Sequence, residues 1–174
     1  IPTPPHCRRP PHFVCCRRPP SLLPAASTEP WEAAAVYAYN TMLKVNDTTF
    51  FMYYDVVAAN KPLLRFTALA ISNDGVTFRK PNLGASFFNG SSANNIVWPR
   101  SDGRAGHPAY DYHEPGTVFI DDKPGVPASE RFKMACSWKG GVWLLSSPDG
   151  ISFTPMFGKP VVPGSDTQNV RPPA

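Results

Sequence analysis

The chain has 174 residues, a hydrophobic fraction of 42% and a formal net charge of +4, which suits a single globular domain. Four arginines against one glutamate give +3 within residues 1–30, so the remainder is nearly neutral and the basic isoelectric point does not indicate a nucleic-acid partner. No apolar run is long enough for a transmembrane helix, so we expect no membrane partner either.

Residues 1–30 differ in composition from the rest of the chain. They hold nine of the 22 prolines, three of the four cysteines and two copies of Cys-Arg-Arg-Pro-Pro, beginning at Cys7 and Cys16. Proline at this density opposes helix and sheet alike, which predicts an extended, mostly disordered arm. The cysteine and histidine spacing matches no standard zinc pattern, and no apolar core of a signal peptide is present. The favoured interpretation is low-complexity sequence translated outside the true reading frame, and a basic interaction tail is the less favoured alternative.

Eight short runs rich in β-branched and aromatic residues follow, in two groups of four, which predicts strands. The first group is Val36–Leu43, Phe50–Tyr54, Arg65–Ile71 and Val76–Phe78; the second is Gly116–Ile120, Arg131–Cys136, Val142–Leu145 and Ile151–Phe153.

The two groups share a repeated motif, Ser-x-Asp-Gly-aliphatic-Ser/Thr-Phe, at residues 72–78 and again at residues 147–153. Asp-Gly favours a tight turn because glycine accepts a positive φ and aspartate bonds to nearby backbone. Each copy therefore predicts a hairpin between the third and fourth strands of its group. Asp74 and Asp149 are interpreted as turn residues rather than catalytic ones. An all-β fold with two four-stranded antiparallel blades of a partial β-propeller is the predicted architecture.

Three acidic residues precede the first strand of a unit: Glu32, Glu114 and Asp166, the last before the first strand of a third unit whose start we expect at about residues 160–174. Acids at these entrances would converge on one axial pocket, and glycoside cleavage needs such a pair or cluster of carboxyl groups. The alternative is that Glu32 caps a turn and that the other two are solvated loop acids.

Aromatic and polar neighbours of these acids are candidate sugar contacts. His113 could bond a substrate hydroxyl, and Trp31, Trp98, Trp138 and Trp143 could offer flat faces to sugar rings, although core packing is favoured for Trp143. Asn46-Asp47-Thr48 and Asn89-Gly90-Ser91 are glycosylation sequons. They suit a secreted protein, but they occur often by chance, so the localisation is left open.

Several of these motifs together resemble five-bladed propeller glycoside hydrolases of the invertase, levansucrase and arabinanase type, closest to uncharacterised members of that superfamily. The motifs are Pro-Trp-Glu at 30–32, Phe-Met-Tyr-Tyr at 51–54, the repeated Ser-x-Asp-Gly motif, His-Glu-Pro-Gly-Thr-Val-Phe at 113–119, Glu-Arg-Phe-Lys-Met at 130–134 and Asp-Thr-Gln-Asn at 166–169. The resemblance covers residues 30–170, about two of five blades.

The resemblance implies blade one at about 31–81, a loop at 82–112, blade two at about 113–156 and the start of blade three at about 160–174. It implies that Glu32, Glu114 and Asp166 form the catalytic triad, with Trp31, His113, Gln168 and Asn169 binding substrate. Well-studied members carry Asp in the first two places and Glu in the third, the reverse of this order. The expected function is hydrolysis of glycosidic bonds without a cofactor or metal, and carbohydrate is the expected partner. A non-catalytic carbohydrate-binding or interaction propeller and a truncated inactive gene product are the alternatives.

Overall fold

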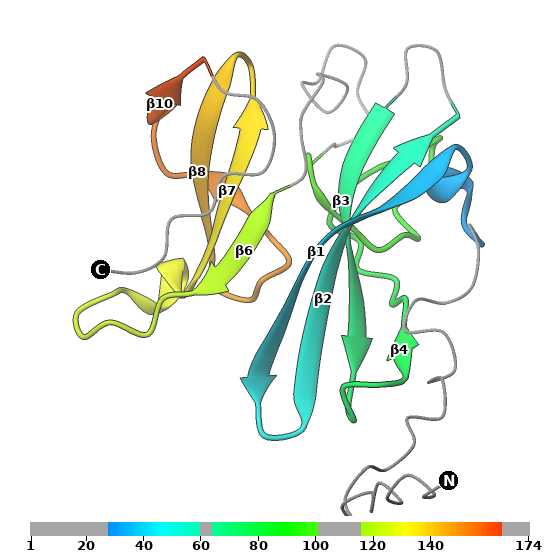
Figure 1. The fold of residues 1–174 in the computed structure, drawn as a ribbon, viewed down its shortest axis with the longest axis horizontal. Helices are drawn as coiled ribbons and strands as arrows, with labels where there is room; N and C mark the ends of the chain where they lie inside the picture. The colour runs from blue at the N-terminus through cyan, green and yellow to red at the C-terminus, as the bar shows by residue number, and fades with distance from the viewer. Residues whose placement is uncertain (1–27, 60–63, 101–115, 165–174) are drawn as a thin grey trace, which may run out of the picture.

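The computed structural model describes residues 28–59, 64–100 and 116–164 (Figure 1). Side chains of residues 38–40 are outside that description. The arm predicted before residue 30 lies almost wholly outside the described residues, as does the chain after residue 164.

The first sheet is an antiparallel meander in the order β1-β2-β3-β4. Its strands are β1 (Ala35–Asn46), β2 (Thr49–Ala58), β3 (Leu64–Ser72) and β4 (Phe78–Arg79), and β5 (Ile96–Trp98) pairs with β3 as a fifth strand. A single 3-10 turn, η1 (Pro30–Glu32), precedes β1. Side chains alternate between the two faces of β2 and β3, so this sheet can pack on both sides.

The second sheet repeats this arrangement. Strands β6 (Thr117–Ile120), β7 (Phe132–Trp138), β8 (Gly141–Ser147) and β9 (Thr154–Pro155) form an antiparallel meander, and β10 (Val162–Pro163) also pairs with β8. A second 3-10 turn, η3 (Ala128–Glu130), precedes β7. The predicted all-β class is confirmed, because the described residues contain two antiparallel sheets and no α-helix.

The main differences between the observed strands and the sequence prediction concern the fourth strands, β5 and β10. Both fourth strands begin later than predicted, at Phe78 and Thr154, because the residues after Asp-Gly remain in the turn. Strand β5 lies inside the segment expected to be a loop. Strand β10 lies where a third unit was expected to begin, and it pairs with the second sheet.

The first repeated turn is organised by Ser72 and Asp74 rather than by a two-residue hairpin. The Ser72 hydroxyl donates to Asp74 Oδ1 at 2.8 Å and accepts from the Gly75 amide at 2.9 Å. Asp74 Oδ1 also accepts from the amides of Val76 and Thr77, at 2.8 and 2.6 Å. These backbone donors hold the pKa of Asp74 well below its ordinary value.

The second turn repeats the same bonds. The Ser147 hydroxyl donates to Asp149 Oδ1 at 2.8 Å and accepts from the Gly150 amide at 3.0 Å, and Asp149 Oδ1 accepts from the amides of Ile151 and Ser152. Burial acts to raise the pKa of Asp149, but these hydrogen bonds outweigh it and the pKa is lowered. The repeated motif is therefore a repeated structure, and the turn role predicted for both aspartates is confirmed.

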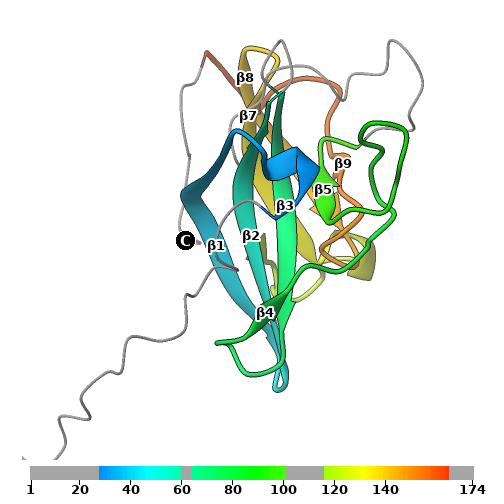
Figure 2. The ribbon, with the colours of Figure 1, turned by 90° about the vertical axis from the view of Figure 1, so that its right-hand side faces the viewer.

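The two sheets pack against each other through one apolar core. Residues of β2 and β3 such as Phe51, Tyr53 and Leu69 meet Phe132 and Met134 of β7. The Phe51 and Phe132 rings stack with centroids 6.1 Å apart. Figure 2 shows the second sheet behind the first, and the first strands of the two sheets, β1 and β6, contact each other (Figure 1).

The opposite face of the first sheet has its own core. Met52, Tyr54 and Phe66 point to this side, where Trp31 of η1 and Phe88 cover them. The Phe88 ring makes edge contacts with Phe66 at 5.5 Å and with Trp31 at 6.2 Å. The loop between β4 and β5 therefore closes this face, which fixes η1 and the start of β1 against the sheet.

Candidate functional site

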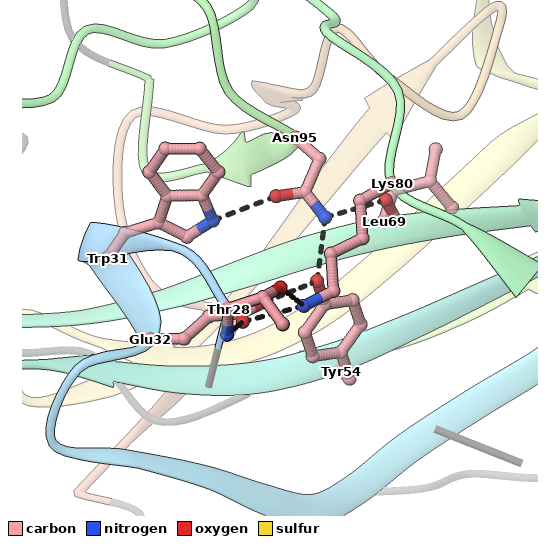
Figure 3. A network of polar contacts seen from close by, with 7 residues as sticks. All are labelled: Thr28, Trp31, Glu32, Tyr54, Leu69, Lys80 and Asn95. Carbon is pink, nitrogen blue, oxygen red and sulfur yellow. Dashed lines mark hydrogen bonds and ion pairs between the residues drawn. The ribbon is translucent and has the colours of Figure 1, made fainter. Parts of the chain in front are cut away.

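Glu32, the first of the predicted acids, lies buried at the end of η1 (Figure 3). Its Oε1 accepts a hydrogen bond from the Tyr54 hydroxyl at 2.8 Å. Its Oε2 accepts from Lys80 Nζ at 2.6 Å and from the Thr28 amide at 3.1 Å. The side chain of Glu32 is 0% exposed and that of Lys80 is 10% exposed, so this is an ion pair largely removed from water.

The network continues through Tyr54 to Asn95. The Tyr54 hydroxyl accepts from Asn95 Nδ2 at 2.6 Å, and the same nitrogen donates to the Leu69 carbonyl at 2.9 Å. Asn95 Oδ1 accepts from the Trp31 indole at 2.8 Å. Figure 3 shows that these groups come from η1, β2, β3 and the loop before β5, and that hydrogen bonds link them into one continuous network. Each hydrogen bond in this network orients the group that makes the next one.

Tyr54 remains a neutral hydrogen-bond donor in this network. Burial raises its pKa far above the ordinary value, and the charge of Glu32 raises it further, although the Asn95 amide opposes the shift. The phenol proton is thereby committed to Glu32. An acid or base that acts on a substrate needs an accessible oxygen, whereas the contacts and burial of Glu32 suit a group that anchors η1.

The hydrogen bond from the Thr28 amide to Glu32 joins the residue before the N-cap of η1 to its last residue, which is similar to the turn-capping role that sequence reasoning gave as the alternative for Glu32. Trp31, predicted to face a sugar ring, is buried against Phe88, and its indole nitrogen is bonded to Asn95. In the described structure both residues hold the entrance of β1 in place.

A second buried charge pair lies on the other face of the first sheet. Arg65 of β3 donates to Asp55 Oδ2 of β2 at 2.6 Å, and Asp55 is 0% exposed. The Arg65 guanidinium also lies 5.5 Å from the centre of the Tyr37 ring on β1. Because Asp55 pairs with Tyr37 across the strands, this charge pair sits near the start of β1. Sequence reasoning missed it, since a lone Asp in an apolar strand carries no motif.

The other tryptophans proposed as sugar platforms form one cluster. Trp98 of β5 meets Trp138 edge-on with ring centroids 5.4 Å apart, and Trp138 lies 4.7 Å from Trp143. All three are buried in the core between the sheets. The core packing favoured for Trp143 is therefore observed, and it extends to Trp98 and Trp138. Lys139 lies over the Trp138 ring at 4.6 Å.

Five predicted site residues fall outside the described residues. They are His113, Glu114, Asp166, Gln168 and Asn169. The predicted convergence of Glu32 with Glu114 and Asp166 stays a prediction. The residues that sequence reasoning overlooked around Glu32 are Tyr54, Lys80 and Asn95, and the available signal was the phenol of Tyr54, because a buried hydroxyl normally requires a partner.

Two further properties concern only the described part of the chain. No helix there has both the length and the apolar character needed to cross a membrane. Residues 28–59, 64–100 and 116–164 also contain no group of three His, Cys, Asp or Glu side chains arranged to hold a metal ion.

Comparison with family models, with curated proteins and with solved structures gave no significant match for this chain.

Proposed function

We propose that the two sheets are consecutive blades of a five-bladed propeller of the glycoside hydrolase type, and that the complete propeller hydrolyses glycosidic bonds. One observation carries the proposal: two antiparallel four-stranded meanders each place the same Ser-x-Asp-Gly turn between their third and fourth strands. Repetition of a whole supersecondary unit with its turn chemistry is the hallmark of a repeat architecture.

The packing of the sheets supports consecutive blades. Blades of a propeller lie face to face, with their first strands side by side around a central channel. Here the two sheets share one core and β1 contacts β6. The motif order that resembles the superfamily places Glu114 just before β6, at the same position in its unit that Glu32 has before β1.

The acids divide into two roles in this proposal. Glu32 positions η1 and the entrance of β1, because its carboxylate is buried and bonded to Tyr54, Lys80 and the Thr28 amide. Glu114 and Asp166 are the pair that we assign to chemistry, one as the acid that protonates the leaving oxygen and the other as nucleophile or base. Gln168, Asn169 and His113 would bond sugar hydroxyls.

A non-catalytic carbohydrate-binding propeller is the second candidate. The observation that favours it is the same burial of Glu32, since a triad with one member committed to structure has lost a group that the superfamily uses on substrate. In this case the propeller would hold a glycan at the same strand entrances and leave its bonds intact.

The experiment that separates the candidates measures both turnover and binding. The gene product that contains this chain is incubated with a panel of plant and microbial glycans. Hydrolysis is measured as the release of new reducing ends, and the affinity for each glycan is measured by calorimetry. Hydrolysis that disappears in Glu114→Gln and persists in Asp122→Asn, an exposed acid in the next loop, supports the enzyme. Binding without turnover supports the second candidate. If the protein neither hydrolyses nor binds any glycan of the panel, both candidate functions are rejected.

A further inference from the structure

The hairpin between β1 and β2 carries a modification motif that the proposed function does not use. Asn46 ends β1 and pairs with Thr49, so Asp47 and Thr48 form the tip of the hairpin. All three sequon residues are exposed. Figure 1 shows this hairpin at the opposite end of β1 from η1, so a group attached here would project away from the strand entrances.

The side chains of this sequon are already in contact. Asn46 Oδ1 accepts hydrogen bonds from the Thr48 amide at 3.0 Å and from the Thr48 hydroxyl at 3.4 Å. Within the described part of the chain the Asn46 amide nitrogen donates no hydrogen bond. Donation to the amide oxygen draws electron density from the nitrogen and makes its protons easier to remove. The exposed nitrogen can then be approached by a bulky donor.

The second sequon, Asn89-Gly90-Ser91, lacks this arrangement. Phe88 and Ser91 exchange two backbone hydrogen bonds, at 2.9 and 3.0 Å, which closes a tight turn around Asn89 and Gly90. The Ser91 hydroxyl accepts from the Ala93 amide at 3.1 Å. No hydrogen bond joins the side chains of Asn89 and Ser91 among the described residues, so Asn46 is the better acceptor of the two.

We propose that Asn46 is an acceptor for an N-linked oligosaccharide. The donor class is an oligosaccharide joined through pyrophosphate to a lipid carrier. The Asn46 amide nitrogen forms a bond to the anomeric carbon, the bond from that carbon to the pyrophosphate oxygen breaks, and one amide proton leaves as the lipid pyrophosphate departs. The step is a substitution at the anomeric carbon with no net oxidation or reduction, so it needs no oxidant or reductant.

The proposal has a consequence for the surface of the protein. A glycan on Asn46 is bulky and solubilising, and it would shield the loop end of the long edge strand β1. Edge strands present unpaired backbone groups that invite pairing with other chains. The same glycan would leave η1 and the start of β1 accessible. Attachment of this glycan would require that the chain enter a compartment where lipid-linked oligosaccharides are available.

The test is translation of the full chain behind a cleavable secretion signal, in the presence of microsomes that carry out N-glycosylation. We expect one mass increase, which a glycan-releasing amidase that hydrolyses the bond between the Asn side chain and the sugar removes. Asn46→Gln and Thr48→Ala should abolish it, Thr48→Ser should retain it because the hydroxyl remains, and Asn89→Gln should leave it unchanged. Asn46 is an exposed residue at the end of β1, and Thr48 and Asn89 are exposed turn residues, so loss of folding does not explain a negative result. A chain without glycan, or with glycan that persists in Asn46→Gln, overturns the proposal.

Discussion

The hydroxyl of Tyr53 on β2 donates a hydrogen bond to the carbonyl of Gly150 in the second Ser-x-Asp-Gly turn, at 2.9 Å. The two residues are 97 positions apart and belong to different sheets. Tyr53 is fully buried, and burial raises the pKa of its phenol far above the ordinary value, so the hydroxyl keeps its proton and the bond persists across the physiological pH range. This contact ties the repeated turn of one sheet to the centre of the other.

Tyr53→Phe should destabilise the fold by about 1–3 kcal/mol, because it leaves the buried Gly150 carbonyl without its donor. The measurement is urea unfolding monitored by tryptophan fluorescence. Thr154→Val removes an exposed hydroxyl from β9 and serves as control, with a change within about 0.5 kcal/mol. Equal stability of the Phe variant and the wild type would show that the sheets are not joined through this bond.

The two Asp-Gly glycines offer a matched pair of substitutions. Both have φ near +74°, Gly75 at 73° and Gly150 at 74°, so alanine is strained by roughly 1–2 kcal/mol at either position. A Cβ on Gly150 would lie 2.5 Å from the Tyr53 hydroxyl and 3.0 Å from Phe132, whereas a Cβ on Gly75 would lie 3.6 Å from Phe50.

Gly150→Ala should therefore cost clearly more stability than Gly75→Ala, by about 1–3 kcal/mol for the added overpacking. Both variants are compared by urea unfolding under the same conditions. If the two alanines destabilise the protein equally, the second turn does not pack against the first sheet as described.

Lys80→Met tests the buried ion pair with Glu32. Removing Lys80 takes away a cation bonded to the buried Glu32 carboxylate, and breaking a buried ion pair in this way costs about 3–5 kcal/mol. The control is Lys44→Met, which breaks the ion pair between Lys44 and Asp47. The two side chains are 56% and 101% exposed, respectively, so this substitution should cost less than about 1 kcal/mol. Chemical denaturation measures both. Similar small effects in the two variants would remove the anchoring role assigned to Glu32.

The carboxylates of the two repeated turns predict an acid dependence of stability. The pKa values of Asp74 and Asp149 are lowered in the folded chain, so they stabilise the fold above the unfolded value of about 3.8 and lose that contribution as pH falls through the folded value. Asp74→Asn should therefore flatten the decline of melting temperature as the pH falls below about 3.8, and leave it unchanged at higher pH. An unchanged slope would contradict the role of the turn hydrogen bonds.

The all-β class and both repeated turns could be predicted from sequence because their signals are local. Asp-Gly after an apolar run identifies a turn, and the strand runs around Tyr53 and Met134 are rich in strand-forming residues. The exact turn length could not be predicted, because Asp74 and Asp149 use their side chains to cap two further amides. Strand β5 was missed because three residues between polar neighbours carry no periodicity.

The surroundings of Glu32 could be predicted only in part. Its place before the first strand follows from the sequence, but its partners do not. Lys80 is 48 positions away and Asn95 is 64 positions from Trp31, and such long-range pairing depends on how the β4–β5 loop closes over the sheet. The buried pair of Asp55 and Arg65 has the same origin, since each residue alone is typical of a solvent-facing strand position.

The measurement that tests the central claim most directly is a crystal structure of the gene product with a bound oligosaccharide. The proposal predicts further blades beside these two sheets, with the sugar at the end where β1 and β6 begin. It predicts the carboxyl groups of Glu114 and Asp166 on either side of the scissile bond, roughly 5–10 Å apart. The proposal would be contradicted if the two carboxyl groups lay at opposite ends of their sheets, or if the sugar bound away from both of them.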